Sequence, residues 1–363
     1  MSSLIEKMQS VKVGKNDQSS VLTSSPFFNK KSMARTQVPI INTALSGELD
    51  GGLTSGLTFV AGESKNFKTL LGLIMVKAYM NEHPDSVCLF YDTEFGTTPP
   101  YVSAAGIDTD RVFHIPVEHL EHMKFDISKR LDAIDKGDKY IIFIDSIGNI
   151  ASKKEIEDAM ESKSAADMTR AKVMKSLWRI VTPSLTTKDL PCVAINHTYQ
   201  TMELFSKAVM SGGTGGMYSA NQVFIISKAK ETEGSGAKTE IVGHKFTINV
   251  EKSRYVKEKS KFPFTVHYKG GINKWSGLFD LALEGGFIQP VSAQKYALAD
   301  PNTGEVNSEE DFKRKETDTK AFWEPMLENA EFKEFVRSKY QLGSDDLIKE
   351  ESQDAEDEED QSE

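Results

Sequence analysis

A lysine and a threonine follow an apolar segment and its terminal glycine, in the order Gly62, Glu63, Ser64, Lys65, Asn66, Phe67, Lys68 and Thr69. A phosphate-binding loop needs backbone N–H groups at a helix N-terminus, a lysine that reaches the terminal phosphates and a hydroxyl group on Mg²⁺. Gly62, Lys68 and Thr69 have the required types and spacing. Phe67 stands where the pattern has glycine, and a negative φ would let its ring point away from the nucleotide. Taken alone, the segment is equally compatible with an ordinary strand–turn–helix connection.

Two carboxylates that follow apolar segments favour the nucleotide interpretation. Asp145 ends the segment that begins at Tyr140, as expected of the carboxylate that orders Mg²⁺ beside a phosphate loop. Glu94 follows the segment Val87–Asp92, and a carboxylate at that position can polarise an attacking water. Together with the loop, these residues predict a site for ATP and Mg²⁺.

A fourth apolar segment ends at Asn196 and His197 and leads into residues Thr198–Ser219. This stretch contains the run Ser211–Gly216, which we interpret as too rich in glycine to form a stable element. Long glycine-rich loops beside an ATP site are usually functional. The alternative is a surface excursion without a binding role.

Alternating strands and helices are needed to position these residues. Helix-length segments separate short apolar ones, so the fold class is α/β, with a mostly parallel sheet covered on both faces and ligands at the carboxyl ends of its strands. Three later runs, around QVFIISKA, KFTINVEKS and PFTVHYKGG, are expected to extend the sheet as antiparallel strands. The expected strands are Leu57–Gly62, Val87–Asp92, Arg111–Val117, Tyr140–Asp145 and Leu190–Asn196; the expected helices are Thr69–Asn81, Leu120–Lys136 and Ala165–Val181.

Changes in composition divide the chain into four parts. Residues 1–34 form a Ser- and Lys-rich arm with a short amphipathic stretch and the pair Phe27 and Phe28, either a docking element or a frayed end. Residues 35–286 form the core. Residues 287–343 form a small subdomain with a hairpin around residues 300–304 and two helices, 321–329 and 332–340. Residues 344–363 form an acidic tail that is expected to be disordered.

Composition excludes several classes of protein. The net charge is −10, but the tail contributes eleven acidic residues and one lysine, so residues 1–343 are formally neutral and can carry a local basic surface. Apolar runs are far shorter than the ~20 residues of a membrane span, and no secretion signal is evident, so a cytoplasmic protein without a membrane partner is expected. Cys88 and Cys192 lie in apolar segments and are expected to be buried free thiols. We assign no metal site to His114, His119 and His122.

The chain resembles the RecA family of recombinases, and within it the branch of T-even-type bacteriophages. The resemblance covers nearly the whole chain and is highly specific. The phage branch also has a bulky residue before the loop lysine, so Phe67 departs only from the wider family. The matching motifs are FFNKK, ALSGEL, GESKNFKT, LFYDTEFG, FIDSIGN, ASKKE, MTRAK, RIVTP, AINHTY, NVEKSR, KEKSKF, SGL and YQLG.

The resemblance implies a role for each matched residue. Lys68 and Thr69 would hold the phosphates and Mg²⁺, Asp145 would join the Mg²⁺ shell and Glu94 would activate the hydrolytic water. Tyr101 would stack on adenine. His197 replaces a glutamine that senses the γ-phosphate, and its imidazole is able to titrate near neutral pH. Lys252 and Arg254 would reach the nucleotide of a neighbouring subunit, so hydrolysis should require assembly.

The same resemblance implies two DNA-binding loops, about 154–167 and 198–219. A helix after the first loop has a basic face that includes Lys172, Lys175 and Arg179, which is more often solvated but lies beside these loops. Repeated along a filament, a few cations form a continuous positive groove. The DNA-binding candidates are Arg170, Lys172, Lys175, Met202, Phe205, Lys207, Gly212 and Gly213.

Three functions remain open on these grounds. The first is an ATP-dependent recombinase that forms helical filaments of itself on single-stranded DNA, pairs it with a homologous duplex and exchanges strands, assisted by a mediator and a single-strand DNA-binding protein. The second is a recombination mediator or paralogue without strand exchange. The third is a ring helicase with the same ATPase core. Glu94, Lys252 and Arg254 favour the first over the second, and helical filaments rather than closed hexamers would distinguish the first from the third.

Overall fold

The computed structural model describes residues 3–12, 19–25, 33–135, 137–161, 169–201, 208–234, 239–306 and 310–343. Several features named above lie outside these ranges: the pair Phe27 and Phe28, part of the first DNA loop, the acidic tail, and the DNA-binding candidates Met202, Phe205 and Lys207.

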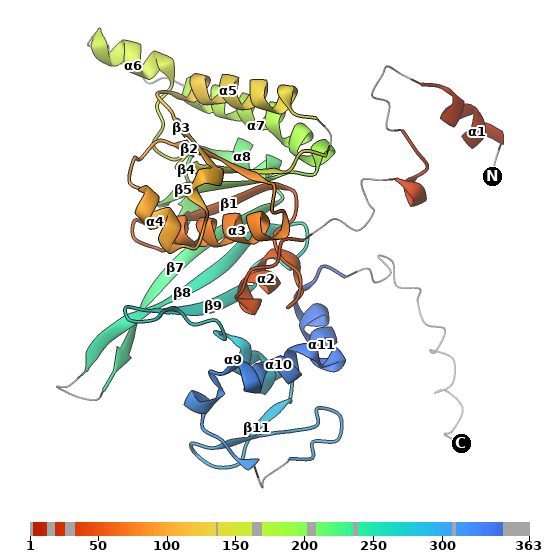
Figure 1. Ribbon diagram of the computed structural model, residues 1–363, viewed down its shortest axis with the longest axis vertical. Coiled ribbons are helices and arrows are strands. Elements are labelled where there is room, and N and C mark those ends of the chain that lie inside the picture. The colour runs from red at the N-terminus through yellow and green to blue at the C-terminus, as the bar shows by residue number, and fades with distance from the viewer. Residues whose placement is uncertain are drawn as a thin grey trace, which may run out of the picture.

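A ten-stranded sheet forms the centre of the described protein, in the order β10-β9-β8-β7-β1-β5-β4-β2-β3, with β6 paired to β5 (Figure 1). The six strands β7-β1-β5-β4-β2-β3 run parallel to one another. On the other side of β7, strands β8, β9 and β10 pair antiparallel in succession, and β6 pairs antiparallel with β5. The strands are β1 Gly56–Gly62, β2 Val87–Asp92, β3 Val112–Pro116, β4 Tyr140–Asp145, β5 Pro191–Gln200, β6 Ala208–Met210, β7 Gln222–Glu233, β8 Glu240–Ser253, β9 Lys261–His267 and β10 Gly271–Ile272.

The parallel register brings the chemically important strand ends to one edge. Gly62 of β1 lies beside His197 of β5, and Asp92 of β2 lies beside Asp145 of β4. This edge is the carboxyl end of the parallel strands, where ligands bind in folds of this class. The predicted fold class and the edge on which the site lies are confirmed.

Helices cover both faces of the sheet because successive strand side chains point to opposite sides. Val60 and Phe143 belong to the hydrophobic cluster that includes α2 and α3, whereas Phe59 and Ile142 belong to the cluster that includes α5 and α7 (Figure 1). Gly72 lets α3 approach the sheet closely, since a Cβ there would lie 2.5 Å from Cε2 of Phe143. The helices that cover the sheet are α2 Pro39–Ser46, α3 Lys68–Glu82, α5 Leu120–Ala133 and α7 Thr169–Lys188.

Other predictions about the core have mixed outcomes. Cys88 and Cys192 are buried and free, as expected. The expected antiparallel pairing of β7 is confirmed on the side of β8, whereas on its other side β7 runs parallel to β1. The chain reaches β7 from β5 through β6 and the short helix α8 Thr214–Ser219, and such a crossover is what a parallel neighbour requires.

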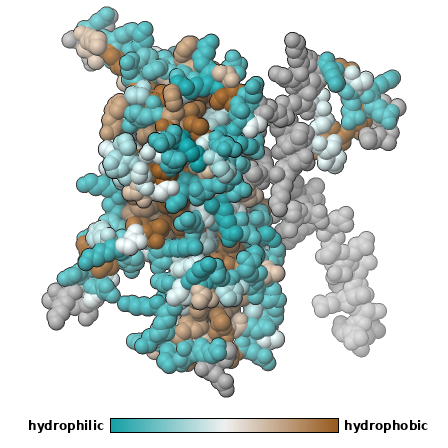
Figure 2. All heavy atoms as spheres, in the orientation of Figure 1, coloured by the Kyte–Doolittle hydropathy of each residue, from teal (hydrophilic) through white to brown (hydrophobic). Residues whose placement is uncertain are grey.

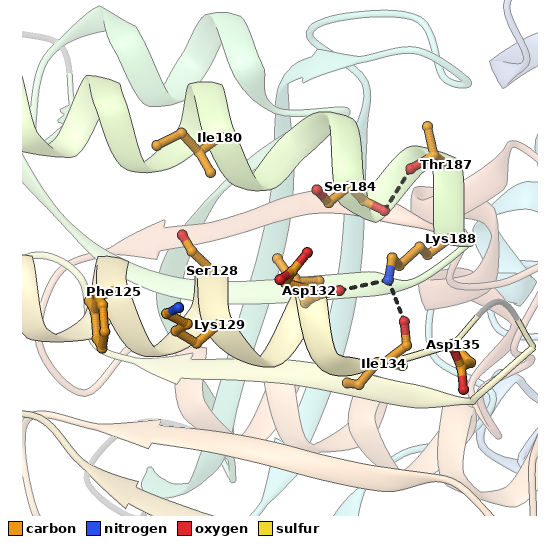
Figure 3. A pocket seen from close by; sticks show the side chains of 11 residues that line it. Phe125, Ser128, Lys129, Asp132, Ile134, Asp135, Ile180, Ser184, Thr187 and Lys188 are labelled. Carbon is orange, nitrogen blue, oxygen red and sulfur yellow. Dashed lines mark hydrogen bonds between the residues drawn. The ribbon is translucent and has the colours of Figure 1, made fainter. Parts of the chain in front are cut away.

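The basic helix is longer than predicted. It was expected to end at Val181 but continues to Lys188 through Pro183. The buried side chains of Val181 and Leu185 continue the apolar face across the proline, so packing outweighs the lost hydrogen bond. Nζ of Lys188 donates to the carbonyls of Leu131, at 2.6 Å, and Ile134, which caps the end of α5 (Figure 3).

The C-terminal residues form the expected hairpin and helices. Asp300 accepts hydrogen bonds from the N–H groups of Asn302 (2.8 Å) and Thr303 (3.0 Å), which makes the tight turn of the hairpin. Tyr340 packs on Phe262 of β9, with ring centroids 4.7 Å apart, so this region shares the hydrophobic core of the sheet. The division at residue 286 stays a prediction. The elements are α9 Leu278–Glu284, β11 Ile288–Pro290, β12 Tyr296–Leu298, α10 Lys320–Glu328 and α11 Ala330–Tyr340.

An N-terminal helix, α1 Ser3–Ser10, lies apart from the body of the protein (Figure 1). It exposes Leu4, Ile5 and Met8, and Figure 2 shows hydrophobic side chains on this separate segment. In the described residues, no helix combines the length and the apolar character that a bilayer crossing requires.

Candidate active site

The loop between β1 and α3 is built to surround a phosphate group. β1 ends at Gly62, α3 begins at Lys68, and the Lys68 side chain reaches back across the loop so that Nζ donates to the carbonyl of Glu63 at 2.6 Å. Lys68 is only 7% exposed, and burial lowers its pKa although Glu94 and Asp145 act in the opposite direction. A phosphate placed in this loop would meet a partly desolvated ammonium group and the N-terminus of a 15-residue helix.

Phe67 has the backbone conformation of the glycine that it replaces. Its φ is 60°, so the residue does not adopt the negative φ considered above. A left-handed conformation costs a non-glycine residue roughly 1–2 kcal/mol. The Phe67 ring offsets this cost by packing on Phe246 of β8 and Phe264 of β9, with centroid distances of 5.1 and 5.6 Å. Tertiary contacts therefore hold the loop in a shape that glycine would adopt freely.

Asn66 fastens the same loop to the sheet. Its buried side chain donates through Nδ2 to the carbonyl of Ile226 in β7 at 2.9 Å. The loop is thus tied to β7 by Asn66 and to β8 and β9 by Phe67. Sequence reasoning placed Asn66 in the loop but found no specific role for it.

Asp145 is arranged as a ligand for a hard cation. Its Oδ2 accepts hydrogen bonds from Oγ1 of Thr69 at 3.0 Å and Oγ1 of Thr97 at 3.2 Å. Oδ1 is buried without a hydrogen-bond partner among the described residues. Burial raises the pKa of Asp145 to about 6. An unpartnered carboxylate oxygen beside a threonine hydroxyl fits the oxygen ligand set that Mg²⁺ prefers, so the residues present fit the expected ion.

Glu94 belongs to a hydrogen-bonded group that joins three strand ends. Its Oε1 accepts from Oγ of Ser146 at 2.5 Å and lies 3.0 Å from Nε2 of His197. Nδ2 of Asn149 lies 3.2 Å from the same imidazole nitrogen. Burial alone would raise the pKa of Glu94, but the hydrogen bonds from Ser146 and His197, together with charge interactions with His197 and Lys68, keep this pKa below its usual value. Glu94 is thereby held as a carboxylate.

One hollow of about 190 Å³ collects most of the predicted site residues. Tyr101, in α4 Pro99–Ala104, is 37% exposed at this hollow, where its ring is accessible for stacking. Gly62 and Glu63 lie at the start of the loop, and Glu63 contributes its carbonyl as described. The predicted residues that line the hollow are Ser64, Lys65, Asn66, Phe67, Lys68, Thr69, Glu94, Tyr101, Asp145 and His197.

Lys252 and Arg254 lie away from this hollow. Lys252 is level with Val223 of β7 and hence with Phe59 of β1, which precedes Gly62 by about 10 Å along the strand. Its Nζ donates to the carbonyls of Met217 (2.8 Å) and Tyr218 (3.1 Å) in α8. Arg254 lies farther still toward the amino-terminal edge. Neither cation therefore reaches the phosphate loop of its own subunit.

The loop that contains the DNA-binding candidates is more ordered than expected. Thr198–Gln200 continue β5 and pair with β6, and Thr214–Ser219 form α8, so the description of this stretch as unable to form stable elements is wrong. Gly216 permits close packing, because a Cβ there would lie 3.2 Å from Phe59 and 3.4 Å from Nε1 of Trp178. Gly212 and Gly213 precede α8 with φ of 92° and 76°, values that favour glycine.

The basic residues of α7 differ in their surroundings. Lys172, Lys175 and Arg179 are exposed, as DNA-binding candidates need to be. Arg170 is half-buried instead, and its guanidinium group donates to backbone carbonyls of the segment after β4. The DNA-binding roles of all these residues stay predictions.

Sequence reasoning missed three site residues, namely Thr97, Ser146 and Asn149. Ser146 follows Asp145 directly, so its proximity to the site could have been expected. Thr97 and Asn149 belong to loops, and only the packing of those loops brings their side chains to Asp145 and His197.

Thr97 offers a test of how Asp145 is held. Replacing Thr97 with valine is expected to lower the stability of the nucleotide-free protein by about 1–3 kcal/mol, because a buried carboxylate loses a donor. Thr98→Val is the matched control, since the Thr98 side chain makes no capping hydrogen bond at the start of α4. Urea unfolding of both variants measures the difference, and equal stabilities would contradict the proposed role.

Comparison with known proteins shows two family matches. The family model for the RecA N-terminal domain matches residues 32–273, and the model described as Bacteriophage T4, Recombination and repair protein, C-terminal domain matches residues 275–336. The Recombination and repair protein of Enterobacteria phage T4 is 50% identical over 343 residues, which cover 94% of this chain and 87% of that protein. Protein RecA of Streptomyces rimosus is 28% identical over 262 residues, which cover 70% of this chain and 66% of that protein. Protein RecA of Kineococcus radiotolerans is 26% identical over 246 residues, which cover 67% and 68% of the two chains.

Proposed function

This chain belongs to the RecA family, and from that membership we propose that it is an ATP-dependent DNA recombinase that assembles on single-stranded DNA, pairs it with a homologous duplex and exchanges strands. The proposed setting is the cytoplasm of a bacterial host, with a mediator and a single-strand DNA-binding protein as partners. DNA recombination and repair is the corresponding process.

One observation carries the proposal. His197 contacts the catalytic candidate Glu94 and belongs to β5. The next residues of β5 pair with β6, and this two-stranded ribbon is part of the proposed DNA-binding loop. A single strand therefore connects the two sites that a DNA-stimulated ATPase must couple. A mediator without ATP-driven strand exchange does not need the whole set of Glu94, Lys252 and Arg254, whereas a ring helicase differs in forming closed rings.

The residues define a path for ATP hydrolysis. Lys68 would bind the β- and γ-phosphates, and bound Mg²⁺, held by Thr69 and Asp145, would neutralise phosphate charge. A water attacks the γ-phosphorus while Glu94 takes its proton, the bond to the bridging oxygen breaks, and ADP leaves with that electron pair. His197, whose Nε2 contacts the Glu94 carboxylate, would respond to the γ-phosphate.

Assembly would complete the site. Because Lys252 and Arg254 lie away from their own phosphate loop, we assign them to the nucleotide of the next subunit. Burial and the adjacent Arg254 lower the pKa of Lys252. An anionic phosphate across an interface would act in the opposite direction and favour the charged form of Lys252.

The N-terminal helix supplies a candidate contact for self-assembly. α1 exposes Met8 at 60%, and a groove between α5 and α7 exposes Phe125 at 64% and Ile180 at 44%. Asp132 and Asp135 line the same groove together with Lys129 and Lys188 (Figure 3), and α1 carries both Glu6 and Lys7, so each surface offers both signs of charge to the other. We therefore assign α1 of one subunit to the α5–α7 groove of the next.

Two charged substitutions test this contact. Met8→Asp and Phe125→Asp are each expected to reduce self-association measured by sedimentation velocity, since each would place a charge in an apolar interface. Leu22→Asp, at another exposed apolar residue of the N-terminal segment, is the control. Unchanged sedimentation of both groove and helix variants would exclude this docking mode.

A D-loop assay tests the proposed function itself. The wild-type protein should form joint molecules from single-stranded DNA and a homologous duplex only with ATP and Mg²⁺, and Lys68→Ala should form none. Joint molecules without ATP, or with Lys68→Ala, would contradict an ATP-driven recombinase. DNA-stimulated hydrolysis without joint molecules would favour a mediator, and closed rings without filaments in electron micrographs would favour a helicase.

A further inference from the structure

Arg170 makes contacts that a phosphate-binding arginine does not need. It is the second residue of α7 and follows the first of the two proposed DNA loops. Its Nε donates to the carbonyl of Ile150 at 2.8 Å, and Nη2 donates to the carbonyls of Ile147 (3.5 Å) and Gly148 (2.5 Å). One guanidinium group thus gathers three carbonyls of the segment 147–150.

This segment lies directly against the catalytic histidine. The N–H of Ile147 donates to the carbonyl of Ile195 at 2.9 Å, which joins the segment to β5. A Cβ on Gly148 would lie 2.5 Å from Cδ2 of His197, so the backbone itself forms a wall for the imidazole ring. Asn149, from the same segment, approaches Nε2 of His197 at 3.2 Å. The position of residues 147–150 therefore limits the position of the imidazole that contacts Glu94.

We propose that Arg170 is a positioning residue that holds segment 147–150 against His197 and so connects the first DNA loop to the Glu94–His197 pair. This inference rests on the proposed function. It gives the site a second connection to DNA, separate from the β5–β6 ribbon. Arg170 acts here through its fixed fork of N–H donors, whereas a DNA phosphate contact depends mainly on positive charge.

The different requirements of the two roles suggest a charge-preserving substitution. Arg170→Lys keeps the positive charge but cannot supply the same fork to three carbonyls. Lys172→Gln is the matched comparison, because Lys172 is an exposed cation two residues farther along the same helix, on a different side from Arg170. Its substitution removes the charge of a proposed phosphate contact.

The expected results separate positioning from DNA contact. Arg170→Lys should lower kcat for ATP hydrolysis at saturating single-stranded DNA by about tenfold or more, with the KM for ATP and the salt dependence of DNA binding unchanged. Lys172→Gln should instead reduce the slope of log K for DNA binding against log salt by about 1. A wild-type kcat for Arg170→Lys would overturn the proposal, as would a loss of DNA affinity in Arg170→Gln with a normal kcat at saturating DNA.

A spectroscopic measurement tests positioning without relying on activity. The protein has seven histidines, so a sample labelled in the histidine rings gives a small set of signals, and His197→Asn identifies that of His197. This signal should move in Arg170→Lys and stay in place in Lys172→Gln, while thermal unfolding checks that both variants fold. An unmoved His197 signal in Arg170→Lys would overturn the proposal. If the wild-type ATPase proves insensitive to DNA, the proposed function fails, whereas a moved signal would still support positioning by Arg170.

Discussion

Glu94→Gln is expected to lower ATP hydrolysis by about a hundredfold to ten-thousandfold while ATP binding is retained. Glutamine keeps the shape of the side chain and can still contact Ser146 and His197, but it cannot take a proton from water. The two hydrogen bonds to the Glu94 carboxylate both fall on Oε1, and the described residues place no donor on Oε2. This second oxygen is the one available to the hydrolytic water. Phosphate release measures turnover, and a fluorescent ATP analogue measures binding.

The exposed Glu82, at the end of α3, provides a control of the same type. Glu82→Gln should hydrolyse ATP at the wild-type rate. Because the Glu94 variant binds ATP without consuming it, its assemblies on single-stranded DNA should also persist longer than those of the wild type. Near-normal turnover in Glu94→Gln would assign the base to another residue of the hollow.

Arg254→Ala is expected to lower hydrolysis by about a thousandfold, the scale seen when an arginine that stabilises phosphoryl transfer is removed. The distinctive result lies in a mixture of two inactive variants. Arg254→Ala keeps Glu94, and Glu94→Gln keeps Arg254, so a complete site forms wherever the cradle of the first faces the cations of the second. In a randomly ordered equimolar assembly, about a quarter of the interfaces satisfy this condition. Hydrolysis should return to about that fraction of the wild-type rate.

Two controls make the mixture decisive. Each variant alone at the same total concentration should stay inactive, and a protein carrying both substitutions should not rescue either one. Arg254 is preferred to Lys252 for this test, because Lys252 also contacts the carbonyl groups of Met217 and Tyr218 in α8. If the mixture of the two variants does not hydrolyse ATP, Arg254 acts within its own subunit and the shared site is contradicted.

Local patterns in the sequence were sufficient for most of the fold. Strands such as Val87–Asp92 and Tyr140–Asp145 were predicted with their observed bounds, because the largely buried strands of a parallel sheet read as short apolar runs that end at polar residues. The same patterns did not reveal that β7 is parallel to β1 or that α7 continues through Pro183. Those features depend on a crossover and on packing between residues distant in sequence.

Residue types and their spacing were enough to predict the phosphate loop, the two carboxylates that follow apolar strands and the family of the protein, because these are local properties of one strand or turn. The remaining features depend on the packed fold. It gave Phe67 a left-handed backbone by packing its ring on Phe246 and Phe264, and it turned Arg170 toward the carbonyls of residues 147–150. Each of these outcomes depends on contacts between segments far apart in the chain, and such contacts exist only after the sheet and its helices have packed together.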